Sequence, residues 1–147
     1  MENIRESNPP KTGLKFWRLL VAACCLASGL LVILLRILPE PREAEVPARG
    51  SLWGIGYAVV PLLMMAVGHV EDDLARMIMK FVLVGMIVLD LLIMLGSLAV
   101  VLMGREVRFI VPTALALAGA MAAHAGACYG VLKVTARREL QQADDSL

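Results

Sequence analysis

Four long apolar stretches alternate with short polar segments along the chain. They cover residues 16–38, 52–70, 77–103 and 109–132. A helix needs roughly 20 apolar residues to cross the hydrocarbon core of a bilayer, and each stretch has about that length or more. The pattern predicts an all-α integral membrane protein with four spans, folded as a tetraspan four-helix bundle in the lipid bilayer.

The breaks in this pattern carry residues that end or bend helices. Pro39 and Pro41 follow the first stretch and bar its continuation. Residues 104–108 form a tight connection, so we expect the third and fourth spans to be antiparallel neighbours. Pro61 lies inside the second stretch, where we predict a kink. A neighbouring helix can satisfy the carbonyl group that this proline leaves without its usual donor.

The polar segments outside the transmembrane domain 16–132 set its orientation. Residues 1–15 are predicted to be a disordered polar leader, and residues 133–147 a short cytoplasmic tail. The bases on the side of the leader, the middle loop and the tail are Arg5, Lys11, Lys15, Arg18, Arg76, Lys80, Lys133, Arg137 and Arg138. Those on the opposite side are Arg36, Arg42, Arg49, Arg105 and Arg108. Because cytoplasmic loops carry the excess of Lys and Arg, both termini are predicted to be cytoplasmic.

The composition narrows the class of protein further. Hydrophobic residues make up 59% of the chain and charged residues 18%, whereas about a quarter of the residues in a soluble domain are charged. The bases form no stripe suited to nucleic acid, and the cysteines lie in apolar stretches rather than in a disulfide framework. The sequence has no nucleophilic triad, phosphate-binding glycine loop or Cys-x-x-Cys pair. We therefore predict no enzymatic activity, no cofactor and no nucleic-acid partner.

Asp90 is the polar residue that stands out, because it lies at the middle of the third apolar stretch. A carboxylate near the centre of a bilayer costs roughly 2.5–3.5 kcal/mol on insertion scales. Such residues often mark ion or substrate paths, although a structural contact between helices is an equal alternative. Helical spacing puts Met86, Ile93 and Ser97 on the same face as Asp90. Only Ser97 among them is polar, so the partner of Asp90 must come from another helix.

His124 in the fourth stretch is the best candidate for that partner. If the third and fourth spans are antiparallel, His124 lies roughly 5 Å along the bundle axis from Asp90. This offset is short enough for the two side chains to meet directly or through water. We predict an intramembrane pair of Asp90 and His124. The alternative is that His124 bonds to a backbone carbonyl group or lies on a different face.

The fourth stretch also has a run of small residues that suits close helix packing. Ala118, Ala122, Gly126 and Gly130 recur at every fourth position. Small residues let helix backbones approach closely in a membrane, so these four are predicted to form a helix-packing face. An Ala-rich helix that faces lipid is the alternative. His124 lies about 200° from Gly126 around the helix, so the two should face different neighbours.

His69 and the acids at 71–73 are the group that most suggests a metal site. Their spacing matches no firm pattern of metal ligands, and acids at a helix start commonly cap the helix. Cys24 and Cys25 are adjacent and point to different sides of a helix, so small apolar packing is their expected role. We therefore predict no metal site.

Two functions fit these features. One is a structural, scaffolding or complex-assembly role, through packing with other copies of the chain or with other membrane proteins. The other is a dimeric proton- or ion-coupled small transporter that uses Asp90. The predicted chain has four spans, two cytoplasmic termini, Arg18 at the start of the first span and Asp90 in the third. In this outline it resembles four-span scaffold families such as the MARVEL-type and Casparian-strip-like proteins. The third and fourth spans hold only Phe81, Phe109 and Tyr129 as aromatic residues, too few for the aromatic-lined pocket of a small exporter, and this favours assembly over transport.

Overall fold

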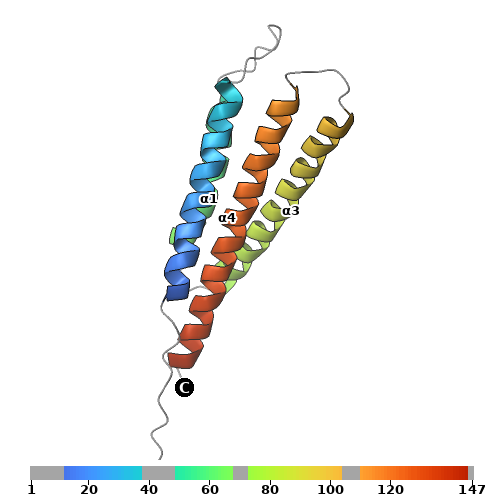
Figure 1. Cartoon of the computed structure of the whole chain (residues 1–147). Helices are drawn as coiled ribbons and strands as arrows, with labels where there is room; N and C mark the ends of the chain where they lie inside the picture. The colour runs from blue at the N-terminus through green and yellow to red at the C-terminus, as the bar shows by residue number, and fades with distance from the viewer. Residues whose placement is uncertain (1–11, 38–48, 68–72, 104–109, 146–147) are drawn as a thin grey trace, which may run out of the picture.

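The computed structural model describes residues 12–37, 49–67, 73–103 and 110–145, and every one of these segments is a helix. The helices are α1 (Thr12–Ile37), α2 (Arg49–Val67), α3 (Asp73–Met103) and α4 (Ile110–Asp145). Figure 1 shows α4 between α1 and α3, with α2 largely behind α1. Helix α4 packs against the other three helices, most extensively against α1 and α3. The prediction of an all-α protein is confirmed.

Three of the described helices are long and apolar enough to cross a membrane. They are Gly13–Leu35, Asp73–Met103 and Ile110–Asp144. The apolar part of α2 that the structure describes, Trp53–Val67, is shorter. The structure thus supports a membrane protein with three candidate spans. The fourth span remains a prediction, and part of it lies outside the described residues.

The surface of the bundle is apolar, and its interior is built from small side chains. Exposed residues include Leu19, Leu92 and Leu102, which are 73%, 62% and 86% accessible. A water-soluble helix would turn such residues inward. Alanines fill much of the buried face of α4, including Ala120 and Ala127, both 0% exposed. This arrangement suits a lipid environment, where close approach of backbones holds helices together.

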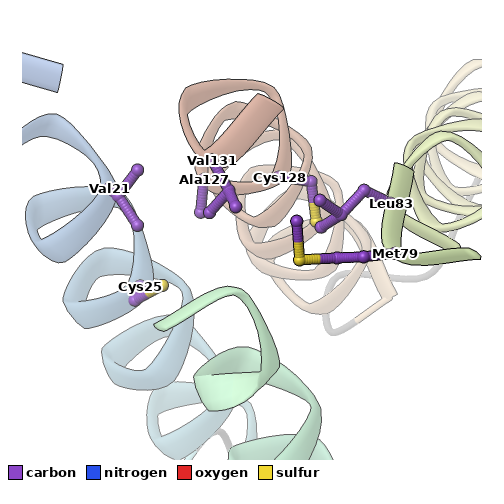
Figure 2. Packing of buried hydrophobic residues seen from close by; sticks show 7 residues of the cluster. All are labelled: Val21, Cys25, Met79, Leu83, Ala127, Cys128 and Val131. Carbon is purple, nitrogen blue, oxygen red and sulfur yellow. The ribbon is translucent and has the colours of Figure 1, made fainter. Parts of the chain in front are cut away.

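The apolar core joins three helices through α4. Its fully or nearly buried members are Val21, Cys25, Met79, Leu83, Ala127, Cys128 and Val131. Figure 2 shows Ala127 and Val131 of α4 on the side of α1, and Cys128 on the side of α3. Helix α4 is therefore the central helix of the bundle, and it presents a different face to each neighbour.

Two helices extend beyond the residues predicted to cross the membrane. Helix α1 begins at Thr12, inside the predicted leader, while residues 1–11 lie outside the described part. Helix α4 continues to Asp145, through most of the predicted tail. The reason is that residues 133–145 contain no Gly or Pro, and seven of them are Ala, Arg, Gln or Leu, which favour helix whether or not lipid surrounds them.

Candidate functional site

The structure places the two residues of the predicted pair in direct contact. Nδ1 of His124 lies 2.6 Å from Oδ2 of Asp90, and both side chains are 0% exposed. Asp90 lies on the inward face of α3, which also contains the buried residues Leu83 and Ser97. Because these positions are seven residues apart, they follow one stripe along the helix. The stripe faces α4, so Asp90 meets His124 across the α3–α4 interface.

The second ring nitrogen of His124 bonds to the backbone of α2. Nε2 of His124 lies 3.0 Å from the carbonyl oxygen of Tyr57. In a regular helix this carbonyl group would accept the backbone N–H of residue 61, four positions later. Residue 61 is a buried proline, which has no N–H to donate. His124 therefore supplies the hydrogen bond that Pro61 removes. The sequence offered a contact with Asp90 and a contact with a backbone carbonyl group as alternatives for His124, and the structure shows both.

Tyr57 completes the cluster from the side of α2. Its hydroxyl group donates a hydrogen bond to Oδ1 of Asp90 over 3.1 Å. Its ring stacks on the imidazole of His124, with 4.1 Å between the ring centroids and 23° between the planes. Tyr57 thus contacts both members of the pair, and the cluster of Tyr57, Asp90 and His124 joins α2, α3 and α4.

These contacts fix the number of protons on the pair. A carbonyl oxygen can only accept, so Nε2 of His124 must carry a hydrogen and donate it to Tyr57. One further proton must then lie between Nδ1 and Oδ2. Either the Asp90 carboxyl group donates it to a neutral imidazole, or an imidazolium donates it to the carboxylate. Both arrangements leave the pair without net charge, which suits a site enclosed by apolar helices.

Cys128 lies next to this cluster, one helical turn after His124. Its sulfur is 3.9 Å from Nδ1 of His124, and its side chain is 0% exposed. Asp90, His124 and Cys128 together form a group of three buried donors whose ligand atoms lie within 4.8 Å of one another. Ser97, by contrast, bonds to the carbonyl oxygen of Ile93 in its own helix over 2.8 Å. Ser97 lies on the predicted stripe, but this hydrogen bond joins it to neither Asp90 nor His124.

The predicted helix-packing face does not act as one surface. A Cβ atom added at Gly130 would lie 2.6 Å from Cγ2 of Val21, and one at Gly126 would lie 3.4 Å from Sγ of Cys24. These two glycines therefore pack against α1. Ala118 is buried, whereas Ala122 is exposed in the single chain, so a packing contact at Ala122 remains a prediction. The geometry of the helix separates the four positions.

A step of four residues turns about 400° around a helix, so a row at every fourth position drifts by about 40° per step. Ala118 and Gly130 are therefore about 120° apart, too far to share one neighbour. The glycine positions that approach α1 follow a spacing of seven and then four residues. They are Gly119, Gly126 and Gly130. Gly119 belongs to this contact because an added Cβ atom would lie 3.2 Å from Cδ1 of Leu31.

An ion pair joins α3 to the C-terminal part of α4. Nζ of Lys80 lies 2.7 and 2.9 Å from the two carboxylate oxygens of Glu139. The side chains are 41% and 35% exposed, so water screens the pair and its contribution is about 0.2–1 kcal/mol. The pair was not predicted, because residue 139 was assigned to the tail. It shows that this part of α4 packs on α3.

The other group considered for metal binding lies mainly outside the described residues. His69, Glu71 and Asp72 fall in the segment that the structure does not describe. Asp73 begins α3, and its carboxylate accepts a hydrogen bond from Arg76 over 2.7 Å. This contact is the ordinary arrangement of an acid in the first turn of a helix.

Sequence reasoning missed Tyr57 and the role of Cys128 as a neighbour of the pair. A signal for Tyr57 was present, because its carbonyl group is the one that Pro61 leaves without a donor. No protein-family model, no curated protein and no solved structure matches this chain.

Proposed function

We propose that this chain is a non-enzymatic, four-span integral membrane protein that assembles with copies of itself through the outward face of α3. Both termini would face the cytoplasm, following the excess of bases on that side. The polar chemistry of the bundle supports a structural role. Asp90 and His124 are 0% exposed, and their contacts with each other and with Tyr57 lie within the chain. Such a cluster holds helices together and offers no surface to a substrate.

The proposal depends on four exposed residues on the outward face of α3. Gly85, Leu89, Leu92 and Gly96 follow a spacing of four, three and four residues, and all four are exposed. We call these four residues the α3 seam. A Cβ atom added at either glycine would meet no atom within 4 Å. Within the described part of the chain, the two glycine positions of the seam therefore face open space.

Glycine is a poor residue for a face that contacts only lipid. It lowers helix stability by about 1 kcal/mol relative to alanine and adds no apolar surface. It does allow the backbone of a second helix to approach closely. The spacing of the α3 seam is that of helices crossing at a shallow angle, with leucines between the two glycines. A second copy of α3 fits this pattern.

A double substitution of the α3 seam tests the proposal. Gly85→Leu together with Gly96→Leu should leave the monomer folded, because each added side chain enters open space. Gly56→Leu is the matched control, since Gly56 lies on α2 and an added Cβ atom there also meets nothing within 4 Å. Full-length chains with donor or acceptor dyes would be mixed in liposomes at increasing lipid-to-protein ratios. The wild type and Gly56→Leu should show energy transfer above random collision, and the seam variant should lose it.

Two outcomes would contradict the proposal. Energy transfer that is equal in the wild type and the seam variant would exclude this face as the contact. Proton flux in the same liposomes, abolished by Asp90→Asn, would instead support the dimeric transporter.

The groove between α2 and α3, of about 490 Å³, favours assembly over transport. Its lining is almost entirely apolar, with Leu63 and Val82 among its walls, and it does not include Asp90.

A further inference from the structure

The three buried donors Asp90, His124 and Cys128 have the composition of a transition-metal site. They offer a carboxylate oxygen, an imidazole nitrogen and a thiol sulfur, all within 4.8 Å of one another. Two of them, His124 and Cys128, lie one turn apart on α4, which keeps their donor atoms on the same side of the helix. Asp90 approaches from α3. The three donors therefore converge on the α3–α4 interface.

The distances come close to those that a tetrahedral ion requires. Zinc binds nitrogen and oxygen at about 2.0–2.2 Å and sulfur at about 2.3 Å, so its ligand atoms lie about 3.3–3.6 Å apart. The separation of Nδ1 of His124 and Oδ2 of Asp90 is 2.6 Å, and that of Nδ1 and Sγ of Cys128 is 3.9 Å. The first separation would have to lengthen by about 0.7–1.0 Å and the second to shorten by about 0.3–0.6 Å for these atoms to bind one ion.

Tyr57 forms hydrogen bonds with the second polar atom of both His124 and Asp90. Nε2 of His124 donates to its carbonyl oxygen, which leaves Nδ1 as the nitrogen that faces Asp90 and Cys128. Oδ1 of Asp90 accepts the Tyr57 hydroxyl, which leaves Oδ2 on the side of His124. Metal-binding histidines and carboxylates usually have such partners, because the outer contacts fix the tautomer and orientation of the ligand.

We propose that Asp90, His124 and Cys128 bind a single Zn²⁺ ion in the interior of the bundle. The charges balance, because the ion would replace the proton shared by Asp90 and His124 and the proton of the Cys128 thiol. The ligands would then be a carboxylate, a neutral imidazole and a thiolate, and their two negative charges would equal the charge of the ion. Mg²⁺ and Ca²⁺ do not suit these donors, since both prefer oxygen ligands. Three protein ligands leave a fourth coordination position, which a water molecule occupies in zinc sites of this kind.

Bound zinc would strengthen the contact between α3 and α4, whose free energy then includes that of metal binding. The site is independent of the α3 seam, because its ligands face the interior and the seam faces outward. Loss of self-association in the seam variant would therefore leave metal binding unchanged, and loss of metal would not by itself exclude self-association.

Cobalt is a suitable probe, because Co²⁺ accepts the same geometry as Zn²⁺ and absorbs light when a thiolate is bound. The full-length chain, without a histidine tag, would be produced in medium containing Zn²⁺ or Co²⁺ and purified in mild detergent. We expect about one metal ion per chain and a thiolate-to-cobalt charge-transfer band. Cys128→Ser should abolish the band and weaken metal binding by at least the roughly 10–100-fold that loss of an outer-shell partner costs.

Cys25→Ala is the matched control, because Cys25 is a second buried thiol of the same apolar core but belongs to no donor group in the described part of the chain. It should retain the metal and the band. Asp90→Asn, which keeps the shape of the side chain, should weaken binding but keep the thiolate band. Wild-type protein that retains neither Co²⁺ nor Zn²⁺ would overturn the proposal. A band that persists in Cys128→Ser, or one that disappears in Cys25→Ala, would also overturn it.

Discussion

The coupling between Asp90 and His124 gives a quantitative test of the buried cluster. Replacing His124 by Ala removes the contact of 2.6 Å with Asp90, the contact of 3.0 Å with the Tyr57 carbonyl group and the stack on the Tyr57 ring. Hydrogen bonds between membrane helices contribute about 0.6–1.7 kcal/mol each. A stacked aromatic pair adds about 0.5–1.5 kcal/mol. His124→Ala should therefore reduce the free energy of unfolding by about 2–5 kcal/mol.

Asp90→Ala removes two contacts, with His124 and with the Tyr57 hydroxyl group, and should cost about 1–3 kcal/mol. Each single variant loses the contact between Asp90 and His124, so the sum of the two single effects counts this contact twice. The double variant loses it only once. The double variant should therefore be more stable than the sum of the single effects predicts. We expect this difference, the coupling energy, to be about 0.6–1.7 kcal/mol, the contribution of one such hydrogen bond.

The assay is reversible unfolding of the full-length chain in bicelles, followed by the loss of helical circular dichroism. Ser97 provides the control cycle, because it is buried on the same stripe of α3 but bonds to the Ile93 carbonyl group of its own helix. Ser97→Ala and His124→Ala should add within about 0.5 kcal/mol. If Asp90→Ala and His124→Ala are equally additive, the two residues do not interact and the account of the cluster is wrong.

Three further predictions concern separate contacts. Tyr57→Phe removes the hydrogen bond of 3.1 Å to Asp90 but keeps the ring and the carbonyl group, so circular-dichroism unfolding should show a loss of only about 0.5–1.5 kcal/mol. Gly130→Ile places a Cβ atom 2.6 Å from Val21 and should destabilise the α1–α4 contact by about 1–3 kcal/mol in the same assay, whereas an undiminished stability would contradict the packing described. Lys80→Ala should cost less than about 1 kcal/mol, and the difference from wild type should shrink in high salt, because the ion pair with Glu139 is partly exposed.

Much of the fold could be predicted because a bilayer imposes simple rules on a sequence. Apolar length located the helices, and the few residues between α3 and α4 predicted that the two would be antiparallel neighbours. With that pairing, the rise per residue was enough to bring Asp90 and His124 to similar depth. The pair then followed from the cost of leaving a carboxyl group without a partner in hydrocarbon.

The remaining features depend on rotations and distances that hydropathy does not specify. The contact of Tyr57 with Asp90 requires the position and rotation of α2, which hydropathy does not specify even though only residues 68–72 separate α2 from α3. Pro61 indicated that a carbonyl group needed a donor but not which helix would supply it. The row of small residues does not follow one neighbouring helix, because a repeat of four residues drifts around the helix. The helical tail depends on local helix propensity rather than on apolar length.

The proton positions on His124 test the central claim of a buried, uncharged cluster most directly. The chain has two histidines, so His69→Gln leaves His124 as the only one. Imidazole nitrogen-15 spectra of this variant, recorded in bicelles without metal, would assign the tautomer. We expect a hydrogen on Nε2 and a strongly hydrogen-bonded proton between Nδ1 and Asp90, which Asp90→Ala should abolish. A neutral ring that carries its hydrogen on Nδ1 alone, with Nε2 unprotonated, would contradict the bond to the Tyr57 carbonyl group and with it the cluster.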